Sequence, residues 1–257
     1  WVIVVIAGLA NASRVSSAVE VSSVFVPALT QEYGWSKTVI ASGTTIGGIG
    51  VMLAGPVVGR LLDRHGSRVI VPVGAILTGA GCFVLAGVTA APVFIVVYAL
   101  VRLSGQALVQ FPNQVTVAKW FSRRRGKASA LLVGLGALGL ISAPVAVTAI
   151  IGRYGIGEAW MALGALAIAL GVVPTLVFGA RRPEDIGLLP DGDETPPAHA
   201  YSDAGAIVSP DDWTASEAIR TPALWLVAIS AALYSLSSTG VGFHQLAYYV
   251  EQGISAG

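Results

Sequence analysis

Seven apolar stretches, each long enough to cross a lipid bilayer as a helix, divide this chain of 257 residues. A helix rises 1.5 Å per residue, so about 20 apolar residues cross a hydrocarbon core of about 30 Å. Backbone groups in lipid must find partners within the protein, which favours helices over open sheets. We therefore expect an all-α integral membrane protein. The expected spans are residues 1–29, 38–62, 69–90, 92–118, 128–150, 159–180 and 222–250.

The composition supports a membrane protein and excludes several kinds of chemistry. Only 11% of the residues are charged and 54% are hydrophobic, whereas a soluble domain carries about a quarter charged residues. Cys82 is the only cysteine, so neither an intrachain disulfide nor a thiol metal cluster can form. The sequence contains no His-Glu-x-x-His motif and no Gly-x-x-x-x-Gly-Lys-Ser/Thr loop. We expect no metal, no cofactor and no ATP-driven transport.

Residues 181–221 differ from the rest of the chain because they are rich in acidic residues and proline. This segment cannot span a bilayer, and we interpret it as a hydrophilic linker with a short surface helix from Asp211 to Arg220. The expected organisation is a six-helix bundle (1–180), the linker (181–221) and the first helix of a second bundle (222–257). Because the chain begins and ends close to apolar runs, we expect a fragment of a longer protein.

Basic residues gather in the loops that follow the second, fourth and sixth spans. By the positive-inside rule these loops, the linker and the N-terminus lie in the cytoplasm, and the protein is multi-pass in the cell (inner or plasma) membrane. The basic run 119–127 lies between two spans, so we interpret it as a topology signal that contacts lipid headgroups and not as a nucleic-acid site. The loop residues concerned are Arg60, Arg64, Arg68, Lys119, Arg123, Arg124, Arg125, Lys127, Arg181, Arg182 and Arg220.

Small residues recur every four positions in the second span, at Gly43, Gly47, Gly55 and Gly59. Such a stripe lets helices approach closely, so we favour packing over direct solute contact.

The turn between the second and third spans reads Gly-Arg-Leu-Leu-Asp-Arg-His-Gly-Ser-Arg over residues 59–68. An ordinary basic loop with a glycine turn is one interpretation. The spacing also resembles the corresponding loop of major facilitator superfamily transporters, with Ser67 where a basic residue is often found. In that family the loop is a conformational latch between the two halves. The resemblance assigns this role to Gly59, Asp63, Arg64, Gly66 and Arg68.

Three further motifs resemble the monocarboxylate and oxalate–formate branch of this superfamily. They are Lys119-Trp-Phe-Ser-Arg-Arg-Arg-Gly-Lys-Ala, Arg181-Arg-Pro-Glu-Asp-Ile-Gly-Leu-Leu-Pro, and Phe243-His-Gln-Leu-Ala-Tyr-Tyr. Ala130 and Ala247 depart from the branch pattern, which has Gly and Pro there. The resemblance implies the N-terminal six helices, the linker and helix 7 of a twelve-helix transporter.

Charged residues inside the spans mark where a solute is expected to bind. A charge near the bilayer centre costs about 2.5–3.5 kcal/mol on insertion scales, so it normally faces a bundle interior or a wet cavity. Arg102 lies about ten residues into the fourth span, or ~15 Å deep. A guanidinium can hold a carboxylate through two parallel hydrogen bonds. The candidate substrate-binding residues are Arg102, Gln106, Gln110, Asn113, Arg14 and Tyr234.

Glu20 in the first span and His244 in the seventh are the candidates for proton coupling. An alternative is that Glu20 forms a permanent ion pair with Arg102 or Arg14, and that His244 is an interfacial histidine. The resemblance adds that helices 1, 4 and 7 line the central cavity in this superfamily.

These observations predict a secondary active transporter of small organic anions, working as proton-coupled monocarboxylate symport by alternating access. Its partners would be the anion, a proton and membrane lipid. An anion exchanger of the oxalate/formate type is the alternative, and a non-transporting membrane sensor with the same fold is an alternative of another class. An enzyme is not expected, because the polar stripes offer only Glu20 and His244 as a pair of reactive groups.

Overall fold

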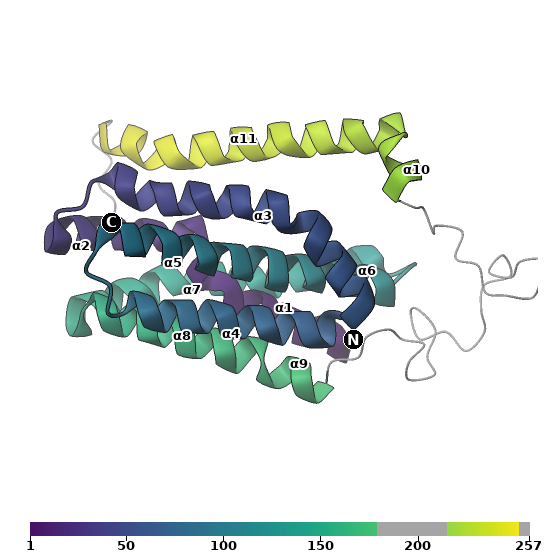
Figure 1. Ribbon diagram of the computed structural model, residues 1–257, viewed down its shortest axis with the longest axis horizontal. Coiled ribbons are helices and arrows are strands. Elements are labelled where there is room, and N and C mark those ends of the chain that lie inside the picture. The colour runs from purple at the N-terminus through teal and green to yellow at the C-terminus, as the bar shows by residue number, and fades with distance from the viewer. Residues whose placement is uncertain (179–214, 252–257) are drawn as a thin grey trace, which may run out of the picture. The chain divides into compact units, whose positions relative to one another are not determined.

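The computed structural model is described over residues 1–178 and 215–251, and this part of the chain is helical with no strand (Figure 1). Within these residues, six helices are long and apolar enough to cross a membrane, which confirms the expected all-α membrane fold. They are Val2–Tyr33, Lys37–His65, Ser67–Leu85, Ala91–Trp120, Arg125–Tyr154 and Ile156–Val177. The chain divides into two compact units, Trp1–Thr195 and Pro196–Gly257, and each is described by itself.

The first unit is a bundle in which neighbouring helices pack in pairs. Helix α3 (Lys37–His65) packs along α5 (Ala91–Leu103), α4 (Ser67–Leu85) along α8 (Ile156–Gly171), and α1 (Val2–Ala12) along α7 (Arg125–Tyr154). Apolar residues from several helices meet in its core. Phe25 stacks on Trp160 with 4.0 Å between ring centroids, and Tyr98 meets the same indole edge-on. Such ring pairs stabilise beyond the area they bury.

The first span is not the single continuous helix that its apolar run predicts. Helix α1 ends at Ala12, a 3₁₀-helix η1 covers Ser13–Ser17, Ala18 is extended (φ −83°, ψ 145°), and α2 runs over Val19–Tyr33. Serine hydroxyls donate to main-chain oxygens in this segment: Ser13 Oγ to Ala10 at 2.6 Å and Ser17 Oγ to Arg14 at 2.7 Å. These local bonds compete with the helical pattern, which explains a break that hydrophobicity alone does not predict.

The fourth span also changes helix type along its length. It begins as α5, continues as a π-helix η2 (Ser104–Gln110) and ends as α6 (Phe111–Trp120). Pro112 is the second residue after the π segment and has no N–H to donate. π segments are uncommon and occur frequently at functional sites.

The turn between α3 and α4 depends on a glycine. Gly66 has φ 74° and ψ 168°, a conformation that is essentially restricted to glycine. This backbone reverses the chain between two helices within one residue.

The glycine stripe of α3 supports close packing over only part of its length. A Cβ at Gly43 would lie 3.1 Å from the ring of Tyr98, and one at Gly47 would lie 2.8 Å from Cβ of Arg102. Gly55 and Gly59 have no such neighbour within 4 Å. Packing against α5 therefore explains the first half of the stripe.

The sixth span consists of α8 and α9 (Val173–Phe178). The second unit contains α10 (Ala215–Ile219) and α11 (Pro222–Glu251). The predicted surface helix 211–220 overlaps α10, and the predicted seventh span 222–250 coincides with α11. Trp225 Nε1 donates to the Ile219 oxygen at 2.8 Å and ties these two helices together. Most of the predicted linker, with the Arg181 motif, lies outside the described residues.

Candidate functional site

Arg102 joins the fourth span to the break in the first. Its Nη1 donates to the main-chain oxygen of Ser17 at 2.8 Å, and the side chain is half-buried. Two glycines allow the close approach. A Cβ at Gly105 would collide with Oγ of Ser17, and one at Gly47 would press on Arg102 itself. These contacts hold Arg102 between α3 and the break in the first span (Val2–Tyr33, called helix 1 below).

Arg14 lies in the broken segment and is held by a residue that the sequence analysis missed. Its Nε donates to Oδ1 of Asn11 at 3.1 Å, and Asn11 is only 6% exposed. A Cβ at Gly136 on α7 would lie 2.5 Å from Nδ2 of Asn11, so the amide is packed tightly. Its spacing of three residues before Arg14 on a helix is the signal that points to this role.

The two arginines and Glu20 form one electrostatic group. Arg14 interacts electrostatically with both Glu20 and Arg102, and Glu20 is exposed in the first turn of α2. Within the described residues, no ion pair joins Glu20 to either arginine. The permanent ion pair of Glu20 with Arg102 or Arg14, which was the structural alternative, is thus not formed in this part of the chain, and Arg102 bonds to the Ser17 carbonyl.

The polar residues that follow Arg102 differ in burial. Gln106 and Gln110 are half-buried within η2, whereas Asn113 is 3% exposed in α6. Nε of Arg102 and Nδ2 of Asn113 are buried without a hydrogen-bond partner in the described part of the chain. Buried polar atoms are nearly always hydrogen-bonded, so these two donors call for an explanation.

The remaining candidates lie on α11 in the second unit. Tyr234 is 74% exposed. His244 belongs to α11, but its side chain lies outside the part that the structure describes, as does the motif around it.

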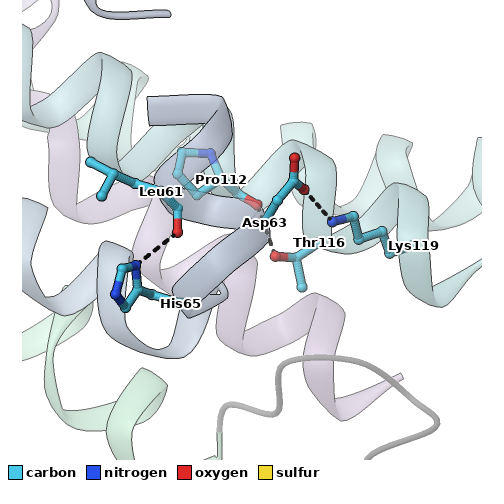
Figure 2. A network of polar contacts seen from close by, with 6 residues as sticks. All are labelled: Leu61, Asp63, His65, Pro112, Thr116 and Lys119. Atoms are coloured by element: carbon cyan, nitrogen blue, oxygen red, sulfur yellow. Dashed lines mark hydrogen bonds and ion pairs between the residues drawn. The ribbon is translucent and has the colours of Figure 1, made fainter. Parts of the chain in front are cut away.

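The 59–68 turn forms a second polar site at one end of the first unit (Figure 2). Asp63 Oδ1 and Lys119 Nζ form an ion pair at 3.1 Å, with side chains that are 71% and 35% exposed. Thr116 Oγ1 donates to the Pro112 oxygen at 2.8 Å, and His65 Nδ1 bonds to the Leu61 oxygen at 3.2 Å. The ion pair connects the turn to the end of the fourth span.

Other residues of the turn have separate surroundings. Arg68 Nη2 donates to the Leu176 oxygen of α9 at 3.3 Å, while Arg64 is exposed. A small hollow lies between the turn and α6, lined by residues that include Asp63, Gly66 and Lys119. The sequence analysis gives Lys119 as a topology signal and as part of a branch motif, and nothing in its local sequence identifies its partner 56 residues earlier.

Comparison with known proteins agrees with this architecture. The sequence model of the family described as the Major Facilitator Superfamily matches residues 2–257. The uncharacterized MFS-type transporter YhjX of Escherichia coli strain K12 is 25% identical over 210 residues, covering 80% of this chain and 48% of that protein. Monocarboxylate transporter 11 of Mus musculus is 36% identical over 118 residues, covering 46% of this chain and 26% of that protein.

A fungal relative is named for efflux. The fujikurins efflux protein of Gibberella fujikuroi is 27% identical over 158 residues, covering 60% of this chain and 34% of that protein. The chain thus spans less than half the length of these curated relatives. Since the family match covers nearly every residue, the chain belongs to the major facilitator superfamily, whose members are multi-pass membrane transporters.

Proposed function

We propose that the chain comprises the N-terminal six helices, the linker and helix 7 of a secondary transporter that carries small organic anions, with protons and monocarboxylates moving together by alternating access. The observation that carries the proposal is the pair Arg14 and Arg102. They lie in the first and fourth spans, which pack against each other. They interact electrostatically and make no ion pair within the described residues.

Two partly buried guanidinium groups that make no ion pair within the described residues are costly in a membrane. Each charge inside a span is normally compensated by a partner or a wet cavity, and like charges raise the cost. An anion that enters between them compensates both, and a carboxylate matches the guanidinium fork. Gln106, Gln110 and Asn113 then offer amide donors for its remaining oxygen lone pairs. Tyr234 on α11 is a further candidate for binding the anion.

Proton coupling follows from the charge of Glu20. Protonation of this carboxyl removes a negative charge that interacts with Arg14 and so frees Arg14 to attract the substrate. The anion and the proton then bind best together, which is the requirement for symport. His244 is the second candidate for a proton-carrying group.

The 59–68 turn has a conformational role in this proposal. Asp63 links the turn to the fourth span through Lys119, and Arg68 links it to the sixth through Leu176. Gly66 allows the reversal, and Gly59 and Arg64 belong to the same latch. The turn, the N-terminus and the 181–221 linker lie in the cytoplasm, and the protein lies in the cell (inner or plasma) membrane.

The test is uptake by the full-length protein in liposomes that contain a trapped pH dye. Lactate is added outside, with sulfate as the control anion, and the wild type is compared with Arg14→Ala and Arg102→Ala. Arg153→Ala is the matched control, because Arg153 is an exposed arginine at the far end of α7. Acidification with lactate, lost in the two site variants and kept in Arg153→Ala, is expected. A signal no larger than that of protein-free liposomes would contradict symport of lactate.

Anion exchange is the second candidate, because two guanidinium groups match the two carboxylates of a small dianion. Liposomes loaded with oxalate test it against external formate, without a proton gradient. Oxalate efflux that needs external formate favours exchange, and efflux that needs a proton gradient favours symport.

A further inference from the structure

The break in helix 1 interrupts the regular helical pattern of main-chain hydrogen bonds, and three side chains donate to main-chain oxygens there. In a continuous helix the carbonyl of residue i accepts from the N–H of residue i+4. Here Ser13 Oγ donates to Ala10, Ser17 Oγ donates to Arg14, and Arg102 Nη1 donates to Ser17. The serines belong to helix 1 itself. Within this set, Arg102 alone ties the break to another span.

Both helices are irregular at this contact. Helix 1 is extended at Ala18 directly after the bonded carbonyl, and the π segment of the fourth span begins two residues after Arg102. Gly105 sets the separation, since a Cβ there would collide with Oγ of Ser17 and lie 2.7 Å from its Cβ. Irregular backbone inside membrane proteins is tolerated where protein or a cavity satisfies it. Here a charged side chain does so.

We infer that Arg102 is a displaceable lock on the bend of helix 1. Without an anion, its Nη1 holds the Ser17 carbonyl and fixes the bend at Ala18. A carboxylate that binds Arg102 withdraws this donor, and the two segments of helix 1 become free to reorient. This step rests on the proposed function, because it needs an anion to reach Arg102.

A carboxylate is a better acceptor for Arg102 than the Ser17 carbonyl. A carboxylate carries the charge opposite to that of the guanidinium and can accept two parallel bonds from it, whereas the Ser17 carbonyl is a neutral acceptor of one bond. The unpartnered Nε of Arg102 gives the guanidinium a further donor to offer. The same donor thus serves the bend when the site is empty and the anion when it is full. One side chain thus couples substrate binding to the movement of helix 1. The bound anion favours the state in which Arg102 has released the Ser17 carbonyl.

Hydrogen exchange read by mass spectrometry tests the lock in the full-length protein. The peptide of interest covers residues 18–22, and spectra are compared without anion, with lactate, with oxalate and with sulfate as the control. Loss of a hydrogen bond to a charged donor shifts local opening roughly tenfold or more, so exchange in this peptide should accelerate by about that factor with a bound carboxylate.

Titration calorimetry on the same samples measures anion binding, and so distinguishes a failure of the lock from a failure of the proposed function. Binding of lactate or oxalate with unchanged exchange would overturn the lock and leave the proposed function standing. No binding of either anion to the wild type would overturn the proposed function, and the displacement step with it.

A steric variant tests the same lock without any anion. Gly105→Ala pushes Ser17 away from Arg102 without altering a charge, and exchange at residues 18–22 should rise to the carboxylate-bound level. Gly48→Ala is the matched control, because a Cβ there has no neighbour within 4 Å. Arg102→Gln is the second variant, in case Gly105→Ala does not fold. It should exchange fast with or without lactate, and slow exchange in a folded form of either site variant would contradict the lock.

Discussion

Arg14 donates from Nε to Oδ1 of Asn11, one turn earlier in helix 1, at 3.1 Å. The amide oxygen orients the guanidinium without neutralising it. Because an aspartate at the same position would form an ion pair, the choice of asparagine keeps a positive charge available next to Arg102. Asn11 therefore positions the Arg14 cation without supplying a negative charge to it.

Asn11→Asp should abolish most anion transport while the protein still folds. The new carboxylate pairs permanently with Arg14 and removes the charge that attracts the substrate. Since hydrogen bonds to charged groups contribute about 1.5–3 kcal/mol, the apparent affinity for lactate should fall roughly tenfold or more. The liposome assay measures it over a range of lactate concentrations.

Asn11→Ser is the control for this experiment, because it removes the amide oxygen without adding a charge. We expect its affinity to lie between those of the wild type and Asn11→Asp. An Asn11→Asp variant that transports like the wild type would contradict a substrate role for Arg14.

The sequence predicts the spans well and the contacts within them poorly. Span positions follow from the cost of burying polar backbone in lipid, which acts on every residue of an apolar run. The break at Ser13–Ala18 depends on a few hydroxyl bonds and on Arg102, 85 residues away from Ser17. The run includes Val15 and Val19, so its hydrophobicity does not predict the helix break.

The same limit applies to the two polar sites. Arg102 was identified because a charge in a span is costly, and Asp63 because the turn spacing is distinctive. Their partners, the Ser17 carbonyl and Lys119, come from distant parts of the sequence and depend on how the helices pack. The π segment was not predicted either, because its residues Ser104–Gln110 have the composition of an ordinary helix.

Gly47→Ala should destabilise the protein, whereas Gly55→Ala should not. A Cβ at Gly47 would lie 2.8 Å from Cβ of Arg102 and 3.0 Å from the Ala99 oxygen, so helices must move apart. Overpacking of this kind costs about 1–3 kcal/mol. Gly55 has open space around it and lies on the same helix, which makes it the matched control. Thermal unfolding in detergent distinguishes them, and equal midpoints would show that the α3–α5 contact is not tight.

Gly66→Ala should weaken the turn between the second and third spans. The backbone at φ 74° and ψ 168° excludes a Cβ, and strain in this region costs about 1–3 kcal/mol. Gly126→Ala is the control, since Gly126 has no neighbour within 4 Å and an ordinary φ. We expect a lower unfolding midpoint for Gly66→Ala alone. A midpoint like that of the wild type would mean that the turn adopts another conformation.

Disrupting the ion pair of Asp63 and Lys119 should affect transport more than stability. Both side chains reach solvent, at 71% and 35% exposed, and such surface pairs contribute only about 0–1 kcal/mol. Asp63→Asn and Lys119→Gln should therefore unfold near the wild-type temperature. If the pair holds the turn against the fourth span in one state of the transport cycle, both variants should slow lactate uptake severalfold. His65→Gln is the control, because His65 is exposed in the same turn and outside the pair.

The exchanged variant Asp63→Lys with Lys119→Asp decides what the pair does. It restores the attraction in reverse, so recovery of uptake would show that the bond itself matters. Uptake that stays low in the exchanged variant would assign the effect to Asp63 acting on another partner. Wild-type uptake in both single variants would contradict the latch. An exposed ion pair contributes little to the free energy of unfolding. A variant that loses transport but still folds has therefore not lost transport through general destabilisation.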